Sequence, residues 1–287
     1  MTADGKQLHV AETFESVFEH LGWSEVRSWL QQNEMAFLFE RSARFDADGL
    51  EPRRALVSIP TVSLTKNAAT ECLQICGAMR MPEHFYAVVS RMMSAAVFVH
   101  FGFEAAQDLR IGKFYLQKAV SENSNQGLEF LGFKWPIQCA AKCVVTRYHR
   151  RTVERIESLI PLLLQALPTS HAGILGPLYE RVLNSFAAAM PDEDPLSRVR
   201  LLEVTEEGSN RRSWDLNVYN LEQNVSCLTD LLPDCLRALG FPSQGLQSWL
   251  KYSNDTTLGH LAAGMSRSQQ PFLTIYHQSA VGDVSVF

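Results

Sequence analysis

Polar and apolar residues alternate along much of this chain, and four alternating stretches contain a polar residue followed two positions later by tyrosine. In the run 111–117, Lys113 and Tyr115 flank Phe114. Residues two apart in a β-strand share one face of a sheet, so the lysine and the tyrosine point one way and the phenylalanine the other. The same step returns in the runs 146–148, 217–219 and 274–276. Such repetition indicates one sheet that carries its tyrosines on one side.

The alternating runs pair into five hairpins. The segments between paired runs favour chain reversal, as in Asp46-Ala47-Asp48-Gly49 and Glu207-Gly208-Ser209-Asn210. The ten predicted strands cover residues 35–44 and 53–64, 97–104 and 109–120, 128–135 and 142–149, 198–205 and 211–220, and 258–265 and 271–277.

Apolar residues at helical spacing predict helices between the hairpins. One or two helices over residues 8–32 are interrupted near Gly22, and Pro82 opens a helix over 83–95. Further helices are predicted over residues 152–167, 174–190, 224–240 and 243–252. The link 121–126 is too short and too polar to hold one.

An antiparallel sheet of ten strands can avoid exposed edges by closing on itself. A ten-stranded barrel is wider than the eight-stranded size that side chains just fill, so its lumen is expected to be a ligand chamber. The predicted fold class is therefore α+β, with a closed ten-stranded antiparallel β-barrel surrounded by a ring of α-helices. Residues 1–287 are expected to form this barrel as a single domain.

The amino-acid composition and charge limit the kinds of partner that the protein is expected to bind. The chain has 287 residues, 46% hydrophobic and 20% charged, which suits a soluble protein with a large core. A formal charge of -5 with mixed signs argues against a nucleic-acid surface. No apolar run has the roughly 18 to 20 residues of a membrane helix, and the N-terminus lacks the pattern of a secretion signal. We expect a cytoplasmic protein that binds neither nucleic acid nor membrane.

Six cysteines include two C-x3-C pairs, at positions 72 and 76 and at 139 and 143. Zinc sites more often use two or four intervening residues and a second matched pair. Buried free thiols in a reducing compartment are therefore favoured over a metal site.

Repeated helix and hairpin units that close a ten-stranded antiparallel barrel resemble the ABBA, or PT-barrel, family of aromatic prenyltransferases. The family's indole-prenylating branch carries Arg in the first repeat, Lys-x-Tyr in the second, Arg-x-Lys-x-Tyr in the third, amide-x-Tyr in the fourth and Tyr in the fifth. The similar residues here are Arg54, Lys113, Tyr115, Tyr148, Asn217, Tyr219 and Tyr276. The resemblance implies that these side chains bind an allylic prenyl diphosphate, with cations at the phosphates and π-faces at the developing allyl cation.

The third repeat departs from the family pattern. Val144 and Thr146 stand where the family has Arg and Lys. Lys142, which shares the face of Tyr148, or Arg147, which lies off phase, could compensate. With fewer fixed cations, we expect Mg²⁺ to be bound with the diphosphate, although the sequence identifies no metal ligands.

Glu40 resembles the family's first-strand carboxylate, which takes the proton from the acceptor. A carboxylate that faces the acceptor has the geometry of a general base, and partial desolvation raises its pKa. The alternative is a glutamate at the rim, paired with Arg41 or Arg44. His260 and Asp215 are also expected to face inward by phase, and structural roles are favoured for both.

The resemblance implies transfer of a dimethylallyl or geranyl group to an electron-rich side chain. The length and the run 258–267 ahead of 271–276 are most similar to the cyanobactin branch, whose acceptors are cyclic ribosomal peptides. The short link 121–126 and the ten residues after His277 predict an open, shallow mouth across which a peptide could lie. One alternative is prenylation of a free aromatic amino acid or small aromatic metabolite. Another is a non-catalytic barrel for a hydrophobic ligand, which leaves Arg54 and Lys113 unexplained.

Overall fold

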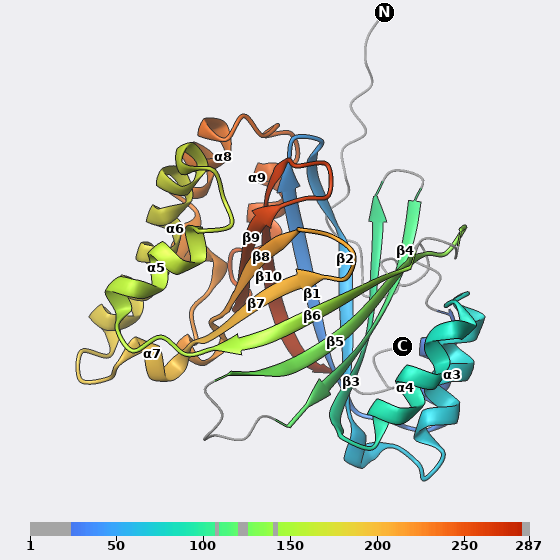
Figure 1. The fold of residues 1–287 in the computed structure, drawn as a ribbon. Coiled ribbons are helices and arrows are strands. Elements are labelled where there is room, and N and C mark those ends of the chain that lie inside the picture. Colours follow the sequence, from blue (N-terminus) through green and yellow to red (C-terminus); the bar gives the residue numbers. More distant parts are fainter. Residues whose placement is uncertain (1–23, 107–108, 120–125, 140–142, 283–287) are drawn as a thin grey trace, which may run out of the picture.

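Ten strands form one closed barrel in this computed structural model, which describes residues 24–106, 109–119, 126–139 and 143–282 (Figure 1). Each strand pairs antiparallel with its neighbour in sequence, and the last pairs with the first. The strands are β1 (Phe37–Asp46), β2 (Gly49–Pro60), β3 (Ala96–Ala106), β4 (Leu109–Lys118), β5 (Gln126–Pro136), β6 (Val144–Arg151), β7 (Arg200–Glu206), β8 (Arg212–Asn217), β9 (Leu258–Met265) and β10 (Pro271–Gly282). The predicted ten-stranded barrel is confirmed.

Strand alternation separates the outer wall from the lumen, as β1 illustrates. Phe37, Phe39 and Phe45 are buried on the outside, where helices cover them, while Glu40 and Ser42 line the inner cavity. Both faces are therefore shielded from water, for different reasons. Burying one large apolar side chain contributes roughly 1.5 to 3 kcal/mol, so the helices stabilise the outer face of each strand that they cover.

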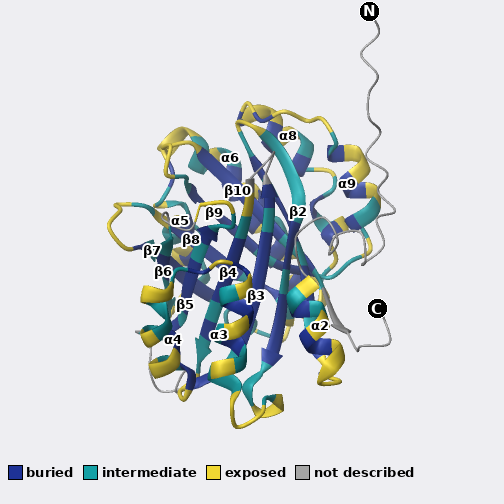
Figure 2. Ribbon diagram, turned by 90° about the vertical axis from the view of Figure 1, so that its right-hand side faces the viewer, coloured by how far each residue is buried: buried dark blue, intermediate teal, exposed yellow. Residues whose placement is uncertain are grey.

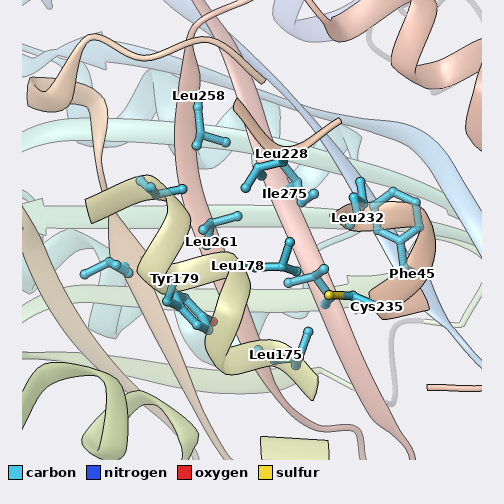
Figure 3. Close-up of a cluster of buried hydrophobic side chains, with 14 of the residues drawn as sticks. Phe45, Leu175, Leu178, Tyr179, Leu228, Leu232, Cys235, Leu258, Leu261 and Ile275 are labelled. Atoms are coloured by element: carbon cyan, nitrogen blue, oxygen red, sulfur yellow. The ribbon is translucent and has the colours of Figure 1, made fainter. Parts of the chain in front are cut away.

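The helices gather in two groups outside the barrel (Figures 1 and 2). The first comprises α2 (Ser24–Gln32), η1 (Thr61–Ser63), α3 (Ala68–Ala78), η2 (Glu83–Phe85) and α4 (Tyr86–Met93). The second comprises α5 (Ile156–Leu164), α6 (Thr169–Ala189), α7 (Pro195–Arg198), η4 (Tyr219–Leu221), η5 (Val225–Leu228), α8 (Leu232–Ala238) and α9 (Leu246–Ser253). Figure 3 shows how Leu178 and Tyr179 of α6 pack toward Leu261 and Ile275 in the core of the second group.

Two helical segments differ from the sequence prediction. The helix α3 was not predicted, because its apolar run is short and only Cys72, Ile75 and Cys76 form its buried face. The continuous helix predicted over 224–240 is wrong: the 3-10 turn η5 comes first, and α8 begins around Pro233. Proline lacks an N–H and suits the first turn of a new helix better than the interior of a long one. The part of the predicted helix over residues 8–23, and the link 121–125, lie outside the described residues.

Between the two helix groups, several outward side chains of β6 and β7 are charged. Arg147 pairs with Glu207, and Nε of Arg151 lies 2.7 Å from Oε2 of Glu203. Tyr148 of β6 lines the cavity, and both arginines are an odd number of residues away from it, so they lie on the outer wall. A wall of paired charges can face water without a covering helix.

Among the described residues, all six cysteines are free thiols, and no group of three or more His, Cys, Asp and Glu side chains is arranged to hold a metal ion. The described helices include none with the length and apolarity needed to cross a bilayer.

Candidate active site

The lumen holds a cavity of about 250 Å³ to which side chains from all ten strands contribute. Every predicted site residue that the structure describes lines it: Glu40, Arg54, Lys113, Tyr115, Tyr148, Asn217, Tyr219 and Tyr276. The remaining predicted residue, Lys142, lies outside the described residues. The polar-x-Tyr pattern therefore identified side chains that converge in one place.

Arg54, Glu104 and Lys113 form one buried group, here called the basic triad. Oε1 of Glu104 forms an ion pair with Nη1 of Arg54, and Oε2 of Glu104 lies 2.6 Å from Nζ of Lys113. Arg54 Nε also lies 3.2 Å from Oγ of Ser42 and donates to it. The sequence analysis did not select Glu104, although it lies in phase with His100 on the predicted strand 97–104, which was the available signal.

Burial lowers the pKa of Lys113 well below its usual value, and the positive charges of Arg54, Arg44 and Arg211 lower it further. Burial also lowers the pKa of Arg54. The ion pairs with Glu104 oppose these shifts by favouring the charged forms. The carboxylate therefore offsets part of the cost of holding two basic side chains side by side in a low-dielectric lumen.

Lys134 of β5 adds a further cation beside the basic triad. It lies opposite Lys113 in the β4–β5 register, and burial together with Lys113 and Arg211 lowers its pKa well below its usual value. Arg147, in contrast, faces outward and pairs with Glu207. The proposal that Arg147 compensates for the third-repeat cations is therefore wrong, and Lys134 is the described lysine that lies beside Lys113. Its alternation with the outward Phe133 and Trp135 could have identified it.

Arg44 and Arg211 complete the positive end of the barrel. Their guanidinium carbons lie 4.2 and 5.4 Å from the ring centre of Phe272, which is buried between β1 and β9. Arg44 also pairs with Asp46 at 2.7 Å and Arg211 with Glu206 at 3.2 Å. Because both arginines are paired, they act on the cavity through the long-range electric field of their charges more than as free hydrogen-bond donors.

Aromatic rings line the middle of the lumen. The Tyr115 and Tyr148 ring centres lie 5.9 Å apart in an edge-to-face arrangement, and Phe130 lies 5.8 Å from Tyr148. Burial raises the pKa values of Tyr115, Tyr148 and Tyr276, so these phenols are neutral at physiological pH. Gly132 makes room for them: a Cβ there would lie 2.5 Å from the Tyr115 ring. These rings offer π-faces to a cation at the centre of the cavity.

His100 is a second lumen residue that the sequence analysis did not select. Its Nδ1 lies 2.7 Å from Oγ of Ser58, and its ring lies 6.5 Å from Tyr115. Burial lowers its pKa to about 4, against a hydrogen bond with Gln117 that raises it. A neutral imidazole therefore faces the cavity at physiological pH.

Glu40, His260 and Asp215 form a second buried group, here called the acidic triad. Nδ1 of His260 lies 2.7 Å from Oδ1 of Asp215, and its Nε2 lies 3.7 Å from Oε2 of Glu40. Tyr219 Oη donates a hydrogen bond to the same Glu40 oxygen. Glu40 is 9% exposed and lines the lumen, so the alternative interpretation as a glutamate at the rim is wrong.

The pKa values of the acidic triad are coupled. Burial raises the pKa of Glu40, and His260 and the Tyr219 hydrogen bond oppose that rise. Burial alone would lower the pKa of His260, but Asp215 and Glu40 outweigh it and raise the value to about 9. A protonated His260 therefore helps Glu40 to remain an acceptor of protons. His260 and Asp215 thus contribute to the site more directly than the structural roles favoured from the sequence.

Asn217 and Tyr219 reach the lumen differently from the prediction. β8 ends at Asn217, and Tyr219 begins the 3-10 turn η4, so the predicted strand 211–220 is too long. Gly259 leaves space for Tyr219, because a Cβ there would lie 2.4 Å from its hydroxyl. Asn217 Nδ2 lies 3.0 Å from Nε2 of His260, and Asn217 Oδ1 accepts from the Tyr219 N–H. Asn217 therefore lies against the acidic triad without bonding a protonated His260, because its Nδ2 and the ring N–H are both donors.

Solved structures with a similar fold are prenyltransferases. The apo form of prenyltransferase PriB aligns with a TM-score of 0.55 at 12% identity, over 84% of this chain and 79% of that chain. NotF in complex with brevianamide F and DMSPP gives 0.54 at 10%, over 84% and 79%. 6-Dimethylallyltryptophan synthase from Micromonospora olivasterospora, in complex with DMASPP and Trp, gives 0.51 at 11%, over 87% and 82%.

No family model and no curated protein matches the chain. At these low identities the similarity shows the fold, which is the closed PT barrel of ABBA-type aromatic prenyltransferases. Similarity to the cyanobactin branch stays a prediction.

Proposed function

We propose that this protein is an aromatic prenyltransferase, which transfers a prenyl group from an allylic diphosphate to an electron-rich acceptor. The observation that carries the proposal is the content of one cavity: Arg54 and Lys113 of the basic triad, a belt of neutral tyrosines and the buried carboxylate of Glu40 all line it. Two structures with the same fold support the proposal, since NotF is in complex with DMSPP and brevianamide F, and the synthase with DMASPP and Trp.

The cavity suits the charge changes of this reaction. Arg54 and Lys113 would take the diphosphate as its carbon–oxygen bond breaks, with Lys134 adding positive charge. Tyr115 and the neighbouring rings would face the allyl cation that forms. The aromatic acceptor then forms the new bond with this cation and loses a proton, which Glu40 accepts.

We further propose that the acceptor is a side chain within a peptide. Apolar side chains, among them Leu38, Phe98 and Leu202, line the cavity close to the ends of their strands. A peptide that inserts one side chain would gain affinity from apolar contacts at such a mouth. One premise is corrected: β10 continues beyond His277 to Gly282 and pairs with β1, so this side of the barrel is taller than predicted.

A mass-spectrometric screen of dimethylallyl and geranyl diphosphate against aromatic amino acids and blocked or cyclic peptides tests both proposals. Prenylated product with any acceptor supports the enzyme class, and its absence with every pair argues for a non-catalytic barrel. The acceptor class is then read from specificity constants. A tenfold preference for the free amino acid, about 1.4 kcal/mol of transition-state binding, would reject the peptide proposal.

Magnesium is proposed as a companion of the diphosphate. The described residues supply no preformed cluster of metal ligands, so the ion would be held chiefly by phosphate oxygens, as is usual for Mg²⁺.

A further inference from the structure

Glu104 lies where the proposed function requires an anion. Each of its carboxylate oxygens contacts one cation, Arg54 through Oε1 and Lys113 through Oε2. The arrangement follows from the strand order, because β3 lies between β2 and β4 and carries Glu104 opposite Arg54. A carboxylate of the protein itself therefore already contacts the cations that a diphosphate would bind.

A diphosphate would offer the same cations a similar partner with more charge. Carboxylate and phosphate oxygens both accept strong charge-assisted hydrogen bonds from Arg and Lys. A diphosphate ester carries roughly three negative charges, and a carboxylate that stays beside it is repelled strongly at the low effective dielectric of a lumen. The two anions therefore compete for Arg54 and Lys113.

We propose that Glu104 is an internal counter-ion, which neutralises Arg54 and Lys113 in the empty barrel and releases both when a diphosphate binds. The inference rests on the proposed function, because it takes the diphosphate as ligand. The position of the side chain fits such a release. Glu104 is 13% exposed, against 7% for Arg54 and 8% for Lys113, and it precedes the end of β3 by two residues. Its carboxylate can therefore rotate toward water while the cations stay in the wall.

This role makes Glu104 a determinant of specificity. An anion that binds must replace the contacts that Glu104 gives up, and only an anion with several charges replaces both. Inorganic phosphate carries fewer charges than pyrophosphate and spans a shorter distance between oxygens. The counter-ion therefore lowers affinity for every anion but lowers it most for small ones, which favours a diphosphate.

The test compares wild type with Glu104→Gln and a matched control, Glu203→Gln. Glu203 is a buried carboxylate on the outer wall, and it contacts Arg151 and Arg212. Calorimetric titration with inorganic pyrophosphate and with inorganic phosphate, each without divalent ions, measures the affinities. Melting temperatures are recorded with and without pyrophosphate.

We expect Glu104→Gln to bind pyrophosphate at least tenfold more tightly than wild type. Its preference for pyrophosphate over phosphate should shrink. The empty variant should melt at a lower temperature, because two cations lose their partner, and pyrophosphate should restore the loss. Glu203→Gln should change either affinity less than threefold. If Glu104→Gln does not fold, Glu104→Asp keeps the charge but is too short to contact both cations, and it should also bind pyrophosphate more tightly than wild type.

Unchanged or weaker pyrophosphate binding by folded Glu104→Gln would overturn the inference. A second result would also overturn it: pyrophosphate binding that requires Mg²⁺ in wild type and is lost in Glu104→Gln. Glu104 would then be a metal ligand. If pyrophosphate binds to none of the folded proteins, with or without Mg²⁺, the proposed function itself fails.

Discussion

The two triads in the lumen solve the same electrostatic problem with opposite charges. They are Arg54–Glu104–Lys113 and Asp215–His260–Glu40. In each, two like charges are buried close together, and an opposite charge between them offsets the cost of their repulsion and desolvation. The basic triad keeps one excess positive charge and the acidic triad one excess negative charge. The first can therefore attract an anion, and the second can accept a proton.

The triads differ in how strongly the structure holds the central residue. His260 has a carboxylate partner at both ring nitrogens, Asp215 at 2.7 Å from Nδ1 and Glu40 at 3.7 Å from Nε2. Glu104 has the two cations as its partners in the basic triad and remains partly exposed. The comparison suggests that the lumen holds a fixed proton acceptor and an exchangeable anion site. Four predictions test this difference between the triads.

The largest effect is expected for Glu40→Gln. Removing a general base typically costs roughly 10² to 10⁴ in rate, so product formation should fall by that range while pyrophosphate affinity stays nearly unchanged. Single-turnover kinetics and calorimetry measure the two separately. Glu203→Gln, which changes a buried glutamate on the outer wall, is the control and should stay near wild type. Collapse of diphosphate binding in Glu40→Gln would instead make Glu40 a structural residue.

Lys113→Ala should abolish most turnover while leaving the barrel folded. A charge-assisted contact is worth roughly 1.5 to 3 kcal/mol, which corresponds to a loss of about 10- to 150-fold in kcat/KM. Steady-state kinetics with circular dichroism checks both parts. Lys118→Ala, at the end of the same strand, should have little effect. Activity near wild type in Lys113→Ala would remove the lysine from the diphosphate site.

His260→Gln should change the pH dependence of stability. The folded-state pKa of His260 is about 9, above its ordinary value of 6.5, so its contribution is complete below pH 6.5 and is lost as pH rises to about 9. The wild type should lose stability over this window by something on the order of 3 kcal/mol, and the variant should not.

Urea unfolding at pH 6, 7, 8 and 9 measures this difference. The same substitution should move the acid limb of kcat/KM to higher pH, because loss of the positive charge raises the pKa of Glu40 further. Identical pH profiles for both proteins would mean that His260 is not charged in the fold.

The smallest effect is expected from magnesium. Beyond Arg54 and Lys113, the structure adds Lys134, Arg44 and Arg211 to the positive end of the barrel, so less of the diphosphate charge remains for a metal to neutralise. We still expect Mg²⁺ to stimulate turnover, by a few-fold. Assays with chelator and with added Mg²⁺ measure this, and full activity in chelator would show that the protein cations suffice.

The sequence predicted the barrel because its signals are local. Alternation along 111–117 and its repeats identifies strands and the faces of their side chains, and short turns identify which strands pair. Local rules were less successful where the chain leaves a strand. Tyr219 follows the alternation of β8 yet lies in a 3-10 turn, and it enters the lumen because Gly259 leaves room for it.

The sequence alone indicates which tyrosines and which two cations line the lumen, because alternation along one strand fixes the face of each side chain whatever lies across the barrel. Only the tertiary structure decided their partners. Glu104 meets Lys113 because β3 and β4 pair in one particular register, and His260 meets Glu40 because β10 closes the barrel between β1 and β9. Such contacts join residues far apart in the chain, and burial gives them their strength, so no local pattern could encode them.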